Sequence, residues 1–518
     1  MTQKPGYQQL NQLCWLVAYD LRQQLRERGS WLLLTVAMVL AVLALLQGDA
    51  QRRATEAAAQ AALAQQNQSI QAAQAEAAAY FANPDNPRYA DMRWWRSAID
   101  VRGYAFREHV DFAVKPELPG AALAIGQSDV LPAVVRVRAE SMDAVRHAAE
   151  IEHPMRLAAG RYDLGFFITT LWPLVLLALT LSALTQDRHH KRLPALALLG
   201  VSPAQVLMAQ VVARVLVAAV MLVLVIGAAA VIVGALPASI AGFAAWARWA
   251  FVVFSVSLFW AGVAALVCAR AANPTTAAFA GFVAWVALVM LIPAVLSAAV
   301  TLAAPLPPRE NNIVAMRDAT DRVQSTRVAV MQRFYDQHPQ WRPQNVPLDK
   351  LPSAVTRLAR AIELENVMAS VQADFSRAQA RQAALWQRVA WASPVSLGFE
   401  LLTEQSGHNG ARHQQFLGEV EQHQSRLRDF FQARIQLAAL SDERQPCKTT
   451  CAGGYGFTDF AAVPRFSASA ALLQQPVMPS AATALLAWAA VLLASAIWLT
   501  RKTRSRAMHA AAVTSTEH

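Results

Sequence analysis

Cys447 and Cys451 form the one closely spaced cysteine pair in the chain, in the segment Cys-Lys-Thr-Thr-Cys. Such a pair could close a small disulfide loop or supply half of a metal site. A tetrahedral metal site needs a second pair of Cys or His ligands at similar spacing, and none accompanies this pair. If the segment lies in an oxidising compartment, the pair favours a disulfide or two free thiols over a metal site.

His408, His413 and His423 could also be proposed as metal ligands. Their offsets of five and ten residues do not place them on one helical face, which repeats about every 3.6 residues, so we expect no metal site there. The sequence also lacks the Gly-x4-Gly-Lys-Ser/Thr phosphate loop, the Gly-x-Ser-x-Gly nucleophile turn and the His-Glu-x-x-His zinc motif. The chain is therefore predicted not to be an enzyme by itself and to hold no cofactor.

Six long runs that are almost free of charged residues dominate the sequence. They are the elements that would position any functional side chain. Each reaches the length of about 20 apolar residues that a helix needs to cross a bilayer, where only a helix satisfies its own backbone groups. Hydrophobic residues make up 55% of the chain, charged residues 16%, and the mean hydropathy is +0.26. We expect an all-α polytopic membrane protein with six transmembrane helices. The predicted spans are residues 31–47, 164–185, 205–235, 249–268, 277–304 and 480–499.

The uneven spacing of the spans leaves two long inserts, residues 48–163 and 305–479, on one face of the membrane. The short loops and tails of the other face hold thirteen of the Lys and Arg residues against four acidic residues. Those cations are Lys4, Arg22, Arg26, Arg28, Arg188, Lys191, Arg192, Arg214, Arg270, Arg501, Lys502, Arg504 and Arg506. Because cations in short loops resist translocation, both termini are predicted cytoplasmic and both inserts extracytoplasmic. The excess positive charge is therefore expected to lie at the inner surface of the membrane. For this reason we expect no nucleic-acid partner.

The inserts are predicted to be mostly helical. An Ala- and Gln-rich stretch at about 52–81 should continue the first span outward as a helix, docking through Leu63, Ile70 and Phe81. Alternating residues in YAFREHVDFAVKP and AVVRVRAE indicate short strands, hence a small α/β lobe in the first insert. The second insert is expected to hold helices at about 311–336, 352–391 and 411–436, followed by loop.

Residues 1–30 contain an amphipathic helix ahead of the first span. Its apolar positions recur at helical spacing, with the charges opposite: Leu13, Leu16, Val17, Leu21 and Leu25. This helix is expected to lie along the inner membrane surface, where it would contact lipids; a plain solvated helix is the alternative. Residues 500–518 form a short cytoplasmic tail.

The loop at 186–204 is the most informative cytoplasmic segment. It runs from an acidic residue through a basic cluster to a short apolar helix and a Val-Ser-Pro turn. The residues expected to act there are Asp187, Arg188, Lys191, Arg192, Leu193, Leu196, Leu199, Val201 and Ser202. Apolar side chains held outside a membrane usually mark an interface, so this helix either fits a groove in a partner or folds against its own spans or the lipid headgroups.

The order of features in this loop resembles that of ABC-2-type transporter permeases, in a branch with large extracytoplasmic inserts after the first and fifth spans. The six-span plan and the N-terminal helix are similar too. Further similar stretches are GQSDVLP at 126–132, HPMRLAAGRYDLGFF at 153–167, PPRE at 307–310 and SPVSLGFELL at 393–402. Asp187 stands where that family commonly has Glu, Lys191 and Arg192 stand where it has Gly-Thr, and Pro194 enters the helix.

The resemblance implies the permease subunit of an exporter in a bacterial inner (cytoplasmic) membrane. It implies that a separate cytoplasmic ABC ATP-binding subunit, which holds ATP and Mg, docks on residues 187–202. It also implies pairing with a second permease copy or a related permease. Two other functions remain open from the residues: a membrane-anchored sensor or scaffold with extracytoplasmic binding lobes, and an ion-coupled carrier. The spans lack the midplane ionisable groups that carriers commonly use, and Arg214 is expected to reach the membrane surface.

Overall fold

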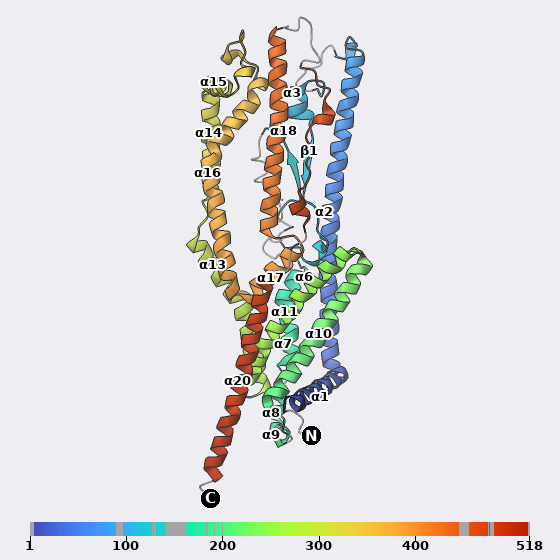
Figure 1. Cartoon of the computed structure of the whole chain (residues 1–518), viewed down its shortest axis with the longest axis vertical. Helices are drawn as coiled ribbons and strands as arrows, with labels where there is room; N and C mark the ends of the chain where they lie inside the picture. Colours follow the sequence, from blue (N-terminus) through green and yellow to red (C-terminus); the bar gives the residue numbers. More distant parts are fainter. Residues whose placement is uncertain are drawn as a thin grey trace.

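The computed structural model describes residues 5–89, 97–126, 128, 131–140, 162–181, 185–190, 192–198, 200–444, 455–474, 476 and 481–515. Within this part of the chain, six helices are long and apolar enough to cross a membrane. The prediction of six membrane-length helices is therefore confirmed, in keeping with a multi-pass membrane protein. The molecule is elongated (Figure 1), with the apolar helices bundled in one half and the two inserts standing beyond them.

The first two helices are α1 (Pro5–Arg26) and α2 (Arg28–Ala82). As predicted, α2 continues beyond the first span without a break and forms one edge of the insert half (Figure 1). Its docking face differs from the expected one, because Leu63 and Phe81 are each 44% exposed. Of the three predicted residues only Ile70 is buried, and its buried neighbours along that face are small or polar. Those neighbours are Ala62, Gln66, Ala73 and Ala77. Small side chains let the lobe pack close to the helix.

The membrane-length bundle is centred on two helices. One is built from α6 (Leu164–Phe166), the π turn η5 (Phe167–Leu171) and α7 (Trp172–Thr180); the other is α11 (Ile240–Arg270). Around them lie α10 (Pro203–Val233), α20 (Ala481–Ser515) and a helix comprising α12 (Pro274–Val286), the π turn η6 (Ala287–Leu291) and α13 (Ile292–Ala303). In their most apolar stretches, 72% of the residues are buried in α11 but 11% in α12–α13. The α12–α13 helix is thus the most peripheral.

Prolines explain the π turns η5 and η6. Pro173 and Pro293 stand at the second residue of α7 and α13, each directly after a π turn. A proline lacks the N–H that the preceding turn would bond and its ring crowds that turn, so the hydrogen-bond ladder is interrupted there. Both prolines lie within predicted spans, at 164–185 and 277–304, and the structure has an irregular turn before each.

Next to α2, the insert half contains a two-stranded antiparallel sheet. We use the name lobe for this sheet together with helix α18 (Gly410–Arg444) and the 455–474 segment, which share one core with it. Strand β1 (Asp111–Val114) pairs with β2 (Val134–Val137), with Asp111 opposite Val137. This confirms the strands expected in both stretches, except that Tyr104–Glu108 forms a π turn, η3, after α3 (Val101–Gly103). The long helix α18 covers the sheet, and its buried side chains meet those of α2 and of the 455–474 segment in one core.

The remaining helices form what we call the arm, residues 309–389. It comprises α14 (Arg309–Ser325), α15 (Arg327–Gln337) and α16 (Ser353–Val389) (Figure 1). The helix expected at 311–336 is thus interrupted at Thr326. Helix α17 (Pro394–Gln405) then packs on the bundle. Shorter elements are η1 (Pro87–Tyr89), η4 (Ala121–Leu123), α8 (Thr185–His189), α9 (Leu193–Leu198), η7 (Pro339–Trp341), η8 (Leu348–Lys350), η9 (Ala390–Ala392), η10 (Phe460–Ala462) and α19 (Ala470–Leu473).

Candidate functional site

The 186–204 loop lies at the end of the bundle opposite the lobe, beside α1 (Figure 1). It folds as two short helices, α8 and α9, joined by a turn in which the Arg192 N–H donates to the Asp187 carbonyl at 2.9 Å. Pro194 is the second residue of α9, where a missing N–H costs little because the first turn of a helix leaves its N–H groups unbonded. The predicted short helix is therefore present in the structure, and its proline is compatible with it.

A capping box ends the loop and starts α10. The Ser202 hydroxyl accepts from the Gln205 N–H at 3.3 Å, and the Gln205 side chain accepts from the Ser202 N–H at 2.8 Å. Gly200 has a φ of +79°, a left-handed conformation that favours glycine, and the Val201 N–H donates back to Leu196 at 3.1 Å. These local bonds give the turn after α9 a defined shape.

Asp187 ties the loop to the bundle. Its carboxylate accepts from the Gln210 amide of α10 at 3.0 Å and lies 3.6 Å from Arg192. The Asp187 side chain is 16% exposed, whereas that of Arg192 is 64% exposed. Arg188 donates to the Ala271 carbonyl between α11 and α12. The loop is thus held to two neighbouring helices while Arg192 stays open to solvent.

The apolar residues of the loop lie partly against the bundle rather than in the open. Leu193, Leu196 and Val201 are half-buried and pack on the bundle core. The described surface that remains for a partner therefore includes Arg192 and Ala195, which are exposed. Lys191 and Leu199, the other residues predicted for this site, lie outside the described residues.

Arg214 differs from its expected behaviour. Instead of reaching the membrane surface alone, its guanidinium donates to both carboxylate oxygens of Asp20 in α1 at 3.2 Å, and to the Leu179 carbonyl of α7 at 2.8 Å. Both side chains are buried, so each needs the other to offset the cost of leaving water. Sequence reasoning missed Asp20, although its position on the Leu16 and Val17 face of α1 was a signal: an acidic residue on an apolar face needs a buried partner.

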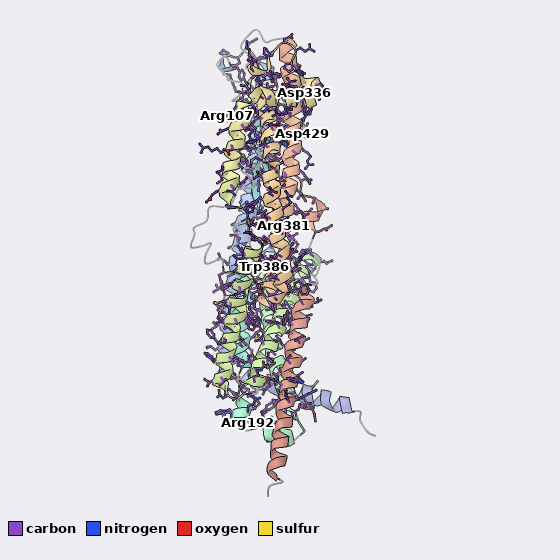
Figure 2. The ribbon with its side chains drawn as sticks, turned by 90° about the vertical axis from the view of Figure 1, so that its left-hand side faces the viewer. Arg107, Arg192, Asp336, Arg381, Trp386 and Asp429 are labelled. Carbon is purple, nitrogen blue, oxygen red and sulfur yellow. The ribbon has the colours of Figure 1, made fainter. Side chains whose placement is uncertain are left out.

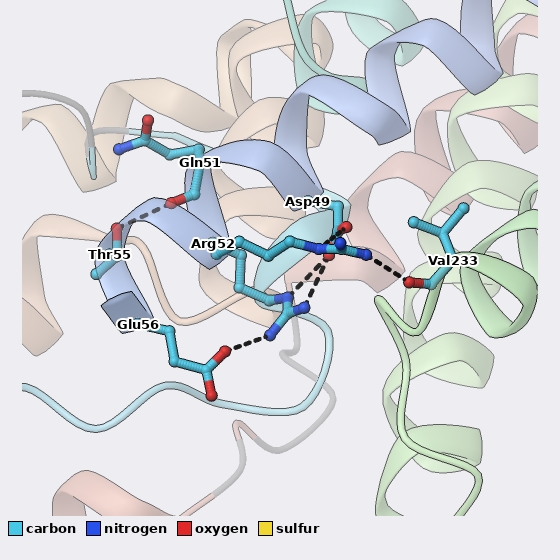
Figure 3. A network of polar contacts seen from close by, with 7 residues as sticks. Asp49, Gln51, Arg52, Thr55, Glu56 and Val233 are labelled. Carbon is cyan, nitrogen blue, oxygen red and sulfur yellow. Dashed lines mark hydrogen bonds and ion pairs between the residues drawn. The ribbon is translucent and has the colours of Figure 1, made fainter. Parts of the chain in front are cut away.

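A second polar network joins α2 to α10 at the other end of the bundle (Figure 3). The buried Asp49 lies 2.9 Å from Arg52 and 2.7 Å from Arg53, and Arg53 also donates to the Val233 carbonyl, at the end of α10, at 2.7 Å. Arg52 also forms an ion pair with Glu56 at 3.1 Å. These contacts fix α2 where it passes from the bundle into the lobe.

The three histidines considered as metal ligands have separate surroundings. His408 Nδ1 lies 2.7 Å from the Ala124 carbonyl, and His423 Nε2 lies 2.5 Å from Asp111, which also accepts from Gln66 at 2.9 Å. Burial lowers the pKa of His408 and of His413 to about 4, so both rings are neutral at pH 7. Within the ranges described above, no three His, Cys, Asp or Glu side chains are grouped to hold a metal.

Two more groups near His408 and His413, Glu117 and Lys115, have shifted pKa values. Burial raises the pKa of Glu117 to about 7 and lowers that of Lys115 to about 8. Arg412 crosses this region and donates to the carbonyls of Pro116, at 2.6 Å, and Leu472, at 2.8 Å. These contacts connect the first insert to the second. Cys447 and Cys451 lie outside the described residues.

Comparison with known proteins concerns the second insert. Residues 309–443 match a family described as a domain of unknown function, DUF3526. The matched segment runs from the first residue of α14 to the penultimate residue of α18, so it covers the arm, α17 and α18 but neither the first five spans nor the 186–204 loop. No curated protein matches this chain.

Proposed function

We propose that this chain is the membrane-spanning permease subunit of an ABC-2-type ATP-driven exporter. A separate cytoplasmic ATP-binding subunit, which holds ATP and Mg, docks on the 186–204 loop, and the permease pairs with a second copy or a related permease. The observation that carries the proposal is this loop: a short, well-anchored helical turn at the end of a six-helix bundle, with a charged residue left exposed beside half-buried leucines.

The anchoring suits a loop that transmits force. A displacement of α9 by a docked partner would be transmitted to α10 through the capping box at Ser202 and through the Asp187–Gln210 hydrogen bond. From α10 it reaches α1 and α7 through Arg214, which bonds Asp20 and the Leu179 carbonyl. A rigid connection of this kind would convert closure of a docked ATPase into movement of the spans. The direction of transport, export, is taken from the family resemblance.

The test uses the exposed surface of the loop, because Leu196 is packed on the bundle and its replacement would disturb folding as well as docking. The variant Arg192→Glu/Ala195→Asp should reduce co-purification with the cognate ATP-binding subunit, and reduce the stimulated ATP hydrolysis, by about tenfold or more. The control is Arg377→Glu on the arm, another charge reversal at an exposed site. Unchanged association and hydrolysis in a correctly folded loop variant would contradict the proposal.

A second candidate, a membrane-anchored sensor or scaffold, is favoured by the separate hydrophobic core of the lobe. The same experiment separates the two functions. A sensor would show no association with an ATP-binding subunit through this loop, and its lobe would retain a partner when the loop is altered.

A further inference from the structure

A groove runs between the end of α13 and the α16 helix of the arm. It has a volume of about 490 Å³ and is open on one side. One wall is the end of α13 with Ala304 and Pro305 after it, and the other is a stripe of α16 that includes Arg381, Leu385 and Arg388. The Gln382 amide donates to the Ala304 carbonyl at 3.1 Å and so holds the two walls together.

The groove is basic. Arg381 and Arg388 are seven residues apart on one helix, so they lie on the same face about 10 Å apart along its axis. Both are exposed, and neither has an ion-pair or hydrogen-bond partner among the described residues. The nearby Arg377, by contrast, pairs with Asp374 at 2.5 Å. Among the residues that the structure describes, no acidic side chain lines the groove, so its two cations can bind an anion.

Tryptophans mark the depth of the groove relative to the bilayer. Trp386 lies on α16 between the two arginines and donates to Glu400, and Figure 2 shows it on the same side of the molecule as Arg381, part-way along its length. Trp488 of α20 is 40% exposed and donates to the carbonyl of Trp391, itself 47% exposed. Tryptophans with a bonded N–H and an exposed ring are typical of the headgroup region of a membrane.

An exposed apolar surface lies next to the groove. On α13, which ends at the groove, Val295 is 57% exposed and Leu302 is 83% exposed. A molecule bound here therefore contacts cations at headgroup depth and, next to them, the exposed apolar surface of α13. That combination matches an amphiphile better than a soluble anion, which would gain nothing from the α13 surface.

We propose that the groove binds an anionic phospholipid from the leaflet on the lobe side. Its phosphate lies between Arg381 and Arg388, where guanidinium groups form charge-assisted bonds, and its acyl chains lie along α13. Together with the Gln382–Ala304 hydrogen bond, the bound lipid holds this part of α16 against the end of α13. This site is independent of the 186–204 loop and of the function proposed for it.

The test is native mass spectrometry of the full chain released from detergent micelles that contain phosphatidylglycerol or phosphatidylcholine. We expect phosphatidylglycerol to bind more tightly, and Arg381→Gln/Arg388→Gln to lower its affinity by about tenfold or more, since two charge-assisted bonds are lost. The matched control, Arg377→Gln, removes a cation from the same helix outside the groove and should keep the wild-type affinity.

A second variant changes shape without changing charge. Ala384 is exposed in the groove, and Ala384→Trp should fill it and lower the phosphatidylglycerol affinity while both arginines remain. Soluble glycerol phosphate, added as a competitor, should not displace the lipid. The proposal is overturned if the double variant or the Ala384 variant binds like the wild type, if Arg377→Gln loses as much affinity, if the two lipids bind equally, or if glycerol phosphate competes fully.

Discussion

His109 is a buried ring in the core of the lobe, close to Tyr104 and Phe431, with ring centroids 5.2 and 5.4 Å away. Neither of its nitrogens has a hydrogen-bond partner among the described residues. Burial lowers the pKa of His109 to about 4, and the charges of His423 and Arg136 act in the same direction while Asp111 opposes them. The ring is therefore neutral at pH 7 and leaves two polar atoms unsatisfied.

His109→Phe should stabilise the lobe by about 1 kcal/mol at pH 7, because it removes unsatisfied buried nitrogens and keeps an aromatic ring. The benefit should grow on acidification. Between pH 6.5 and about 4 the unfolded wild-type chain takes up a proton that the folded state does not, so wild-type stability falls with decreasing pH by about 1.4 kcal/mol per pH unit. The measurement is the melting temperature of both proteins at pH 7 and pH 5.

The difference in melting temperature between wild type and variant isolates His109 from the other titrating groups, since those are shared. Glu117 acts in the opposite direction: its pKa is raised to about 7, so it favours the folded state as pH falls. If the difference is the same at pH 7 and pH 5, His109 is not buried in its neutral form.

At the scale of elements, α2 joins the bundle to the lobe as one 55-residue helix. Its Ala-rich outer half was predictable from composition, since strong helix formers continue a helix that a span has begun. Its docking face was not predictable, because the side chains that became buried are mostly small, and only the partner surface decides which face is used. Gly48 shows how close that contact is: a Cβ there would lie 2.2 Å from the Ala122 carbonyl oxygen.

Gly48→Ala should therefore destabilise the protein by about 1–3 kcal/mol, because backbone on both sides must move apart. Gly29 in the same helix offers a matched control, since nothing lies within 4 Å of a Cβ added there. Gly29→Ala should be neutral or stabilising by about 0.5–1 kcal/mol, through the helix propensity of alanine. Thermal unfolding in detergent measures both. Equal effects of the two substitutions would refute the close packing of α2 on the η4 turn.

For the whole molecule, the lobe and the 186–204 loop lie at opposite ends of the bundle (Figure 1). The excess of Lys and Arg in the short loops and tails predicts that the loop end is cytoplasmic and the lobe extracytoplasmic. If the arrangement spans a membrane, labels that cannot cross it will reach one end and not the other.

In a background without native cysteines, Ser376→Cys on the arm should react with a membrane-impermeant maleimide in intact cells. Ala195→Cys in the loop should react only after the membrane is opened or inverted; both positions are exposed. The readout is the labelled fraction of each variant. Labelling of Ala195→Cys from outside would reverse the orientation and remove the basis for a cytoplasmic docking partner, while labelling of both from one side would contradict a spanning bundle.

Local features of the chain follow from its sequence alone: the six apolar runs, the helical continuation of the first span, the irregular turns before Pro173 and Pro293, and the short helix before Ser202. Each depends on residues within a few turns of one another. Tertiary structure alone decided the long-range pairs, such as Asp20 with Arg214 and Asp111 with His423, and the groove between α13 and α16. The physical reason is that a buried polar group selects its partner only when packing brings distant segments within hydrogen-bond range, and spacing along the chain does not encode that distance.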